Sequence, residues 1–167
     1  SGLQAMRIFI DPSSSNHILF LTQSHDHIYH DNGSITEVFL EEQHGVLESN
    51  DGGKTWDSWA QRLPSPYRAL FDGDVSLNNF NHMIVRPFLF GPKFPPEKVR
   101  QKSFYSTDGG KTFQETPYYI WAGRFDPHDR EGNHLLGFAI ENRMVVESKD
   151  WGKTWEKVGT PVEISSQ

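Results

Sequence analysis

One eight-residue pattern occurs three times in the chain, and it limits the possible folds more than any other feature. The copies are SNDGGKTW at residues 49–56, STDGGKTF at 106–113 and SKDWGKTW at 148–155. They share Ser at the first position, Asp at the third, Gly at the fifth, Lys-Thr at the sixth and seventh, and an aromatic residue at the eighth. We therefore interpret the chain as repeats of one structural unit.

The residue types of this octet suit a tight turn between two strands. Asp and Ser side chains accept hydrogen bonds from nearby backbone N–H groups, and Gly adopts a positive φ without steric cost. β-branched and aromatic residues flank each copy, so we expect strands at residues 45–48, 103–105 and 144–147 before the octets and at 56–59, 113–115 and 155–158 after them. Each octet is thus predicted to connect two antiparallel strands.

Further strand pairs are predicted upstream of the first and third octets. Residues 7–10 and 17–22 flank a turn at Asp11-Pro12, and residues 124–127 followed by 134–140 repeat this arrangement. Four strands per repeat, at the spacing of the octets, fit the roughly 40–50 residues of a propeller blade. We therefore predict an all-β fold of about three β-propeller blades, each of four antiparallel strands. The expected blades are residues 6–63, 64–117 and 118–160, within one segment from 6 to 167.

The pattern S-x-D-x-G-x-T-W resembles the Asp-box, also called the bacterial neuraminidase (BNR) repeat. Such boxes occur in the β-propellers of sialidases, of other glycoside hydrolases such as xyloglucanases, and of sortilin-type receptors, and the resemblance covers residues 6–158. It implies that the boxes are structural turns at the blade periphery, away from the central pocket, so that their Asp residues are not catalytic acids. The residues assigned to the boxes are Ser49, Asp51, Gly53, Thr55, Trp56, Ser106, Asp108, Gly110, Thr112, Phe113, Ser148, Asp150, Gly152, Thr154 and Trp155.

The number of blades raises the question of how the propeller is completed. Propellers typically have four to eight blades, and three blades leave strand edges exposed. The alternatives are a fragment of a longer protein, a homodimer that joins three blades to three, and additional blades from a different chain. Residues 162–164 are a candidate first strand of a fourth blade, and residues 1–5 are expected to be a remnant of expression in front of the natural segment.

Composition argues against several classes of partner. Sixteen Lys and Arg against 22 Asp and Glu give a net charge of -6 without any basic run, so nucleic acid is not an expected partner. The apolar stretches are too short for membrane insertion, and no signal peptide is evident. The absence of cysteine excludes disulfides and thiolate metal sites, and no cofactor is expected. The family resemblance favours an extracellular or periplasmic location.

A polar insertion in the first repeat, residues 23–43, holds a candidate metal site. Its Asp31-Asn32-Gly33 turn signal predicts a protruding hairpin formed by residues 27–30 and 35–40. His25, His27, His30 and Asp31 lie together in this hairpin and could ligate a divalent metal. The alternative interpretation is a solvated polar hairpin.

Aromatic residues outside the octets are candidates for ligand contacts. Trp121 with nearby Arg124 could form a platform on which a pyranose ring stacks, and the alternative is core packing between blades. Tyr67 belongs to the insertion of the second repeat, whose proline-rich segments 63–67 and 88–96 could wrap a partner or pack against a neighbouring blade.

Two functional hypotheses follow from these patterns. The first is a propeller module for protein or carbohydrate binding or scaffolding. The second is a glycoside hydrolase of the sialidase-like group, as a fragment or as a subunit whose pocket is completed by assembly. The arginine motif usual in sialidases is missing, and spacing alone selects no catalytic pair among the 22 acidic residues. We favour binding, because three blades cannot surround a central pocket.

Overall fold

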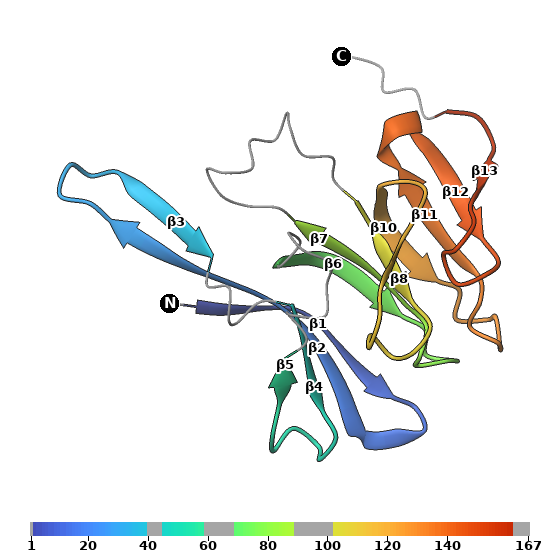
Figure 1. The fold of residues 1–167 in the computed structure, drawn as a ribbon, viewed down its shortest axis with the longest axis horizontal. Helices are drawn as coiled ribbons and strands as arrows, with labels where there is room; N and C mark the ends of the chain where they lie inside the picture. Colours follow the sequence, from blue (N-terminus) through green and yellow to red (C-terminus); the bar gives the residue numbers. More distant parts are fainter. Residues whose placement is uncertain (1, 40–44, 59–68, 89–101, 162–167) are drawn as a thin grey trace. The chain divides into compact units, whose positions relative to one another are not determined.

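The computed structural model describes residues 2–39, 45–58, 69–88 and 102–161 (Figure 1). Within these ranges the chain forms three antiparallel β-sheets. It divides into two compact units, residues 1–71 with 88–100 and residues 72–87 with 101–167. The first unit contains the first sheet, and the second unit contains nearly all of the other two. No helix in the described residues is long and apolar enough to cross a membrane.

The first sheet has the order β1-β2-β4-β5, with β3 paired to the far end of β2. Its strands are β1 (Gly2–Asp11), β2 (Ser14–Tyr29), β3 (Ile35–Phe39), β4 (Gly45–Ser49) and β5 (Asp57–Ser58). The hairpin expected in the insertion is formed by β2 and β3, and its turn is closed by the N–H of His30 on the C=O of Ser34. β3 is thus the strand that the insertion adds, and β1, β2, β4 and β5 are the four strands expected per repeat.

The other two sheets are meanders of four strands, in which each strand pairs with the next one along the chain. The second sheet contains β6 (Ala69–Val75), β7 (Met83–Phe88), β8 (Phe104–Ser106) and β9 (Gln114–Glu115). The third contains β10 (Ile120–Phe125), β11 (Leu135–Ala139), β12 (Met144–Ser148) and β13 (Glu156–Val158). β10 ends at Phe125, and the turn expected at Asp126-Pro127 follows it, where the Asp126 carboxylate accepts the His128 N–H.

The Ser and Asp side chains close all three octets in the same way. In the first, Asp51 Oδ1 accepts the Ser49 hydroxyl and the Thr55 N–H at 2.9 Å each, and Oδ2 accepts the Thr55 hydroxyl at 2.6 Å. The Ser49 hydroxyl in turn accepts the Gly53 N–H at 2.8 Å. Equivalent bonds recur in the second and third octets. The side chains of the octet itself therefore hold the turn closed.

These bonds favour the ionised form of the octet carboxyl groups. The hydroxyl and N–H of Thr55 lower the pKa of Asp51 to about 2. Partial burial raises the pKa of Asp108 and of Asp150, but hydrogen bonds outweigh it and leave both values below the usual range. A carboxyl group with a lowered pKa is a poor general acid near neutral pH, because it does not hold a proton there.

A second repeated pair, Asn-His, ties each octet to the turn between the first two strands of its sheet. The backbone C=O groups of Asn16, Asn81 and Asn133 accept the N–H of the fourth octet residue at 2.9, 3.0 and 2.8 Å. The donors are Gly52, Gly109 and Trp151, and all three have positive φ. Each octet is therefore anchored to a segment that lies far from it in the sequence.

In two sheets the His of this pair lies between two carboxylates. His134 Nδ1 is 2.9 Å from Asp126 Oδ2, and its Nε2 is 2.8 Å from Glu147 Oε1. The hydrogen bond with Asp126 is the largest contribution raising the pKa of His134 above its usual value. The same arrangement joins His17 to Asp11 at 3.0 Å and to Glu48 at 2.8 Å in the first sheet.

In the second sheet the equivalent histidine has a different role. Ser76 stands where the other sheets have Asp, and His82 Nδ1 instead lies 2.8 Å from the backbone O of Gly132 in the third sheet. The His82 ring also lies 5.4 Å from the Trp151 ring of the third octet. A Cβ on Gly132 would come within 2.2 Å of the Ser76 hydroxyl, so the two turns meet at a glycine. His82 therefore links the second sheet to the third.

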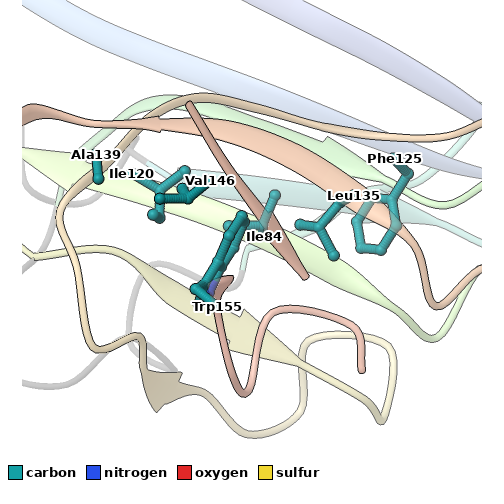
Figure 2. Packing of buried hydrophobic residues seen from close by; sticks show 7 residues of the cluster. All are labelled: Ile84, Ile120, Phe125, Leu135, Ala139, Val146 and Trp155. Carbon is teal, nitrogen blue, oxygen red and sulfur yellow. The ribbon is translucent and has the colours of Figure 1, made fainter. Parts of the chain in front are cut away.

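The core of the second unit lies between its two sheets (Figure 2). Ile84 of β7 packs against side chains of the third sheet: Ile120, Phe125, Leu135, Ala139, Val146 and Trp155. Gly137 makes room for Ile120, because a Cβ at Gly137 would lie 2.4 Å from Ile120 Cγ2. Trp155, at the last octet position, is 8% exposed and donates its indole N–H to the Gly152 C=O at 2.7 Å. The third octet thus contributes its aromatic residue to the core.

Candidate functional site

The candidate site lies at the end of the second and third sheets that is opposite the octets. In the third sheet Leu135 pairs with Ser148, the first octet residue, whereas Ile120 pairs with Ala139 at the other end. In the second sheet Met83 pairs with Ser106, so Arg86 lies further along β7, away from the octet. Side chains at this end are therefore separated from the octet turns by the length of a strand.

Three side chains form a cluster at this end, which we call the Trp121 platform: Arg86, Tyr119 and Trp121. The Arg86 guanidinium carbon lies 3.8 Å from the centroid of the Trp121 ring and 5.9 Å from that of Tyr119. Arg86 Nη1 donates a hydrogen bond to the Tyr119 hydroxyl at 3.1 Å, and the two aromatic rings meet edge to face at 6.4 Å. These contacts hold the indole in one orientation.

Burial differs sharply within this platform. Arg86 is only 4% exposed, whereas Trp121 is 43% exposed. A buried guanidinium beneath an exposed indole is a cation–π contact shielded from water, the environment in which such contacts are strongest. Trp121 therefore presents an aromatic surface to solvent while its position is fixed from below.

The backbone next to Trp121 is irregular. The pairing of β10 with β11 shifts between Trp121 and Arg124, and Ala122 has φ 55, in the left-handed region that non-glycine residues rarely adopt. Gly123 follows, and a Cβ there would lie 3.2 Å from side-chain carbons of both Ile120 and Ile84. Bulges of this kind re-aim side chains and are common beside functional sites.

Arg124 links β10 to β6, and none of its described contacts is with the Trp121 platform. Its Nη2 lies 3.2 Å from Asp72 Oδ2, and its Nη1 donates to the Gly123 C=O at 2.6 Å. Asp74 Oδ2 accepts the Phe125 N–H at 2.8 Å. Two carboxylates on β6 therefore bind the first strand of the third sheet to the first strand of the second.

The remaining candidates are only partly described. Tyr67 lies outside the described residues, as do residues 89–96 of the proline-rich segment and residues 162–164. His25 and His27 belong to β2, but their side chains are outside the described part, and His30 and Asp31 are exposed in the hairpin turn. Within the described residues, no three His, Asp or Glu side chains are placed to hold a metal ion.

Sequence reasoning selected Trp121 as a candidate for ligand contacts but did not place Arg86 and Tyr119 beside it. Arg86 comes from β7, more than thirty residues upstream, and no local pattern relates the two. The Asn-His pairs were also missed, although they recur three times. The separation between each pair and its octet differs from sheet to sheet, so no fixed period reveals them.

No protein-family model matches the sequence, and no curated protein is similar to it in sequence. Solved structures, however, are similar in fold. The GH74 xyloglucanase from Xanthomonas campestris has a TM-score of 0.59 at 12% identity, over 93% of this chain and 22% of that chain. The Niastella koreensis GH74 enzyme has a TM-score of 0.58 at 15% identity, over 95% and 22% of the two chains.

A structure of YCF48 bound to D1 peptide is also similar, with a TM-score of 0.50 at 14% identity, over 92% of this chain and 39% of that chain. The chain thus spans about a fifth of the length of the GH74 enzymes and about two fifths of YCF48. At such low identity the likeness concerns the fold. The three antiparallel sheets are blades of a β-propeller.

Proposed function

We propose that this chain is a segment of an Asp-box β-propeller that binds carbohydrate at the end of its blades opposite the boxes. The observation that carries the proposal is Trp121, an exposed indole fixed on a buried arginine. Sugar rings present flat C–H faces that pack on aromatic rings, and polar groups nearby bond their hydroxyls. The Trp121 platform offers such a surface.

Preorganisation supports this role. Binding costs conformational entropy whenever a side chain must be ordered by the ligand. Arg86 and Tyr119 already order the indole, and the bulge at Ala122 fixes the backbone that carries it. A ligand that stacks on Trp121 would therefore meet a surface that needs little rearrangement.

A protein ligand is the second candidate. Trp, Tyr and Arg are the residues most enriched at the energetic centres of protein interfaces, and the Trp121 platform contains one of each. YCF48, which is similar in fold, is described as bound to a peptide. This candidate uses the same side chains, so one set of variants tests both ligand classes.

Glycoside hydrolysis is a third possibility, raised by the GH74 enzymes of similar fold. It requires two carboxyl groups about 5–10 Å apart across the substrate, one of which holds a proton. Asp72 and Asp74 are the carboxylates of the neighbouring strand, but Asp72 is paired with Arg124 and Asp74 accepts a backbone N–H. Because both carboxylates are used in contacts that hold the two sheets together, we favour binding over catalysis.

The test is calorimetric titration with xyloglucan oligosaccharides, cello-oligosaccharides and sialyllactose. We expect Trp121→Ala to weaken binding at least about tenfold, since a stacked aromatic pair contributes about 0.5–1.5 kcal/mol beyond area burial. Trp121→Phe should retain part of the affinity. Ile140→Ala is the matched control, because Ile140 is also exposed at this end of the third sheet.

Three outcomes would change the proposal. Glycan binding that Trp121→Ala leaves intact would exclude the platform as the site. Binding of peptides alone, lost in Trp121→Ala, would identify a protein ligand. Sustained turnover of fluorogenic glycosides that Asp72→Asn abolishes would replace binding by hydrolysis.

A further inference from the structure

In the Trp121 platform, the contact with Arg86 fixes the hydrogen-bonding role of the Tyr119 hydroxyl. Arg86 Nη1 donates to this hydroxyl at 3.1 Å, and a guanidinium carries N–H donors but no acceptor. Tyr119 is therefore the acceptor in this contact, and its own O–H proton is left for another partner. A hydroxyl that accepts a bond from a cation is also polarised by it, which strengthens the bond that the hydroxyl donates. Tyr119 is thus a directed hydrogen-bond donor.

No acceptor for this proton lies within hydrogen-bond distance in the described part of the chain. The other hydrogen bonds of Tyr119 involve its backbone: its N–H donates to the Glu141 carboxylate at 2.9 Å, and its C=O accepts the Ile140 N–H at 3.3 Å. Tyr119 is only 8% exposed, and a buried donor that is left without an acceptor destabilises the protein. The acceptor is therefore water in the free protein and an oxygen of the ligand in the complex.

The position of this donor is fixed before a ligand binds. The backbone bonds to Glu141 and Ile140 hold Tyr119 just before β10, and Arg86 holds the hydroxyl end of its side chain. The hydroxyl also lies close to the exposed indole, because the guanidinium that it contacts is 3.8 Å from the centroid of the Trp121 ring. The platform therefore combines a stacking surface with one oriented O–H donor.

We propose that Tyr119 selects the ligand of the Trp121 platform by donating to a carbonyl-type oxygen on the stacked sugar, in a carboxylate or an acetamido group. This inference rests on the proposed carbohydrate binding. A sugar hydroxyl also accepts from Tyr119, but its own proton then needs an acceptor, which neither Tyr119 nor Arg86 offers. A carbonyl-type oxygen has no such proton, and a carboxylate makes the stronger, charge-assisted bond. An ammonium group is rejected, because it places a donor against a donor.

The test compares β-1,4-linked oligosaccharides of equal length that differ in one substituent of each ring. Cello-oligosaccharides carry hydroxyl groups alone, chito-oligosaccharides an acetamido group, glucuronic acid oligomers a carboxylate and glucosamine oligomers an amine. Calorimetric titration at about pH 5.5 keeps the carboxylate ionised and the amine protonated. We expect the acetamido or the carboxylate series to bind about tenfold more tightly than cello-oligosaccharides, and the glucosamine series to bind most weakly. The series that binds most tightly identifies the group.

Tyr119→Phe removes the hydroxyl and keeps the ring that meets Trp121 edge to face. Cello-oligosaccharides should then bind within about threefold of the wild type, whereas the roughly tenfold preference should disappear. Tyr118→Phe is the matched control: it removes a hydroxyl from the adjacent residue, which lines a separate groove beside Trp155, and it should leave the preference unchanged. Circular dichroism shows whether each variant has remained folded. The affinities of the wild type test the proposal even if Tyr119→Phe does not fold.

The outcomes separate this inference from the carbohydrate proposal on which it rests. A wild-type protein that binds cello-oligosaccharides as tightly as both the acetamido and the carboxylate series would overturn the inference and leave carbohydrate binding in place. A preference that survives in folded Tyr119→Phe would do the same, as would glucosamine oligomers that bind as tightly as chito-oligosaccharides. Absence of binding in every series would overturn the carbohydrate proposal and this inference with it.

Discussion

Replacing Gly137 by Ala tests the packing of the third sheet most directly. The new Cβ would lie 2.4 Å from Ile120 Cγ2 and 3.4 Å from Trp155 Cζ3, whereas carbon atoms pack favourably at about 3.5–4.0 Å. Ile120 Cγ2 is bonded directly to Cβ, so it moves away only if χ1 of a buried side chain rotates. The clash therefore cannot be relieved by the end of a flexible side chain.

The expected change in the free energy of unfolding is the sum of two opposing effects. Ala is favoured over Gly in a strand by about 0.5–1 kcal/mol, because Gly loses more conformational entropy on folding. Overpacking a filled core costs about 1–3 kcal/mol. We expect Gly137→Ala to lower the free energy of unfolding by about 0.5–2 kcal/mol, which corresponds to a Tm lower by about 2–6 °C for a chain of this size.

Urea denaturation followed by tryptophan fluorescence measures this difference at a fixed protein concentration. The control is a double-mutant cycle with Ile120→Ala, which removes the clashing methyl group. The methyl group introduced by Gly137→Ala should then fill part of the cavity, so that the double variant is at least about 1 kcal/mol more stable than the sum of the single effects predicts. Equal or greater stability of Gly137→Ala, or strict additivity in the cycle, would refute the packing argument.

Three further predictions concern the octets, the histidine contacts and the bulge. Asp150→Ala removes the carboxylate that accepts the Thr154 N–H and hydroxyl, so the free energy of unfolding measured by urea denaturation should fall by about 1–3 kcal/mol. The control Lys153→Ala, at an exposed position, should change it by less than about 0.5 kcal/mol. The hydrogen bond with Asp126 raises the pKa of His134, so this contact contributes stability that is present below the unfolded value of 6.5 and is lost as pH rises through the folded pKa. The His128 N–H lowers the pKa of Asp126, and Lys149 lowers that of Glu147, with His134 the second contribution in both; the stability from these contacts is present above the unfolded values of 3.8 and 4.5 and is lost as pH falls. His134→Gln should therefore be most destabilising between about pH 4.5 and 6.5, and a loss that does not vary with pH between 5 and 9 would contradict this. Ala122→Gly removes about 1–2 kcal/mol of strain from the left-handed backbone at Ala122 and costs about 0.5–1 kcal/mol in backbone entropy. The variant should therefore be as stable as the wild type or up to about 1 kcal/mol more stable. A clear loss of stability in the same denaturation assay would argue against the strain.

The octet hairpins could be predicted from sequence because their interactions are local. Ser49, Asp51, Gly53 and Thr55 bond to one another within a single turn, so the eight residues carry the information that closes it. The strands beside the octets were found within a residue or two for the same reason. β6 and β7 were not identified, because they lie in the insertion of the second repeat, where no octet or turn signal marks their limits.

Only part of the candidate site could be predicted from the sequence. Trp121 was selected as an aromatic residue outside the octets, and Arg124 was chosen as its partner because it lies nearby in the chain. In the structure Arg124 pairs with Asp72, and the cation beneath Trp121 is Arg86 of another sheet. The bulge at Ala122 explains the difference, because it breaks the alternation from which side-chain direction along a strand is inferred.

The sequence by itself determined the repeated turn and the all-β class, since both depend on residue types within a few positions of one another. Only the tertiary structure decided which chemically similar residues are buried and which are exposed. Trp56 and Trp155 end nearly identical octets and make the same indole hydrogen bond, yet one is exposed and the other belongs to a core. The physical reason is that burial depends on whether another sheet covers that face, and no local pattern encodes the presence of a neighbouring sheet.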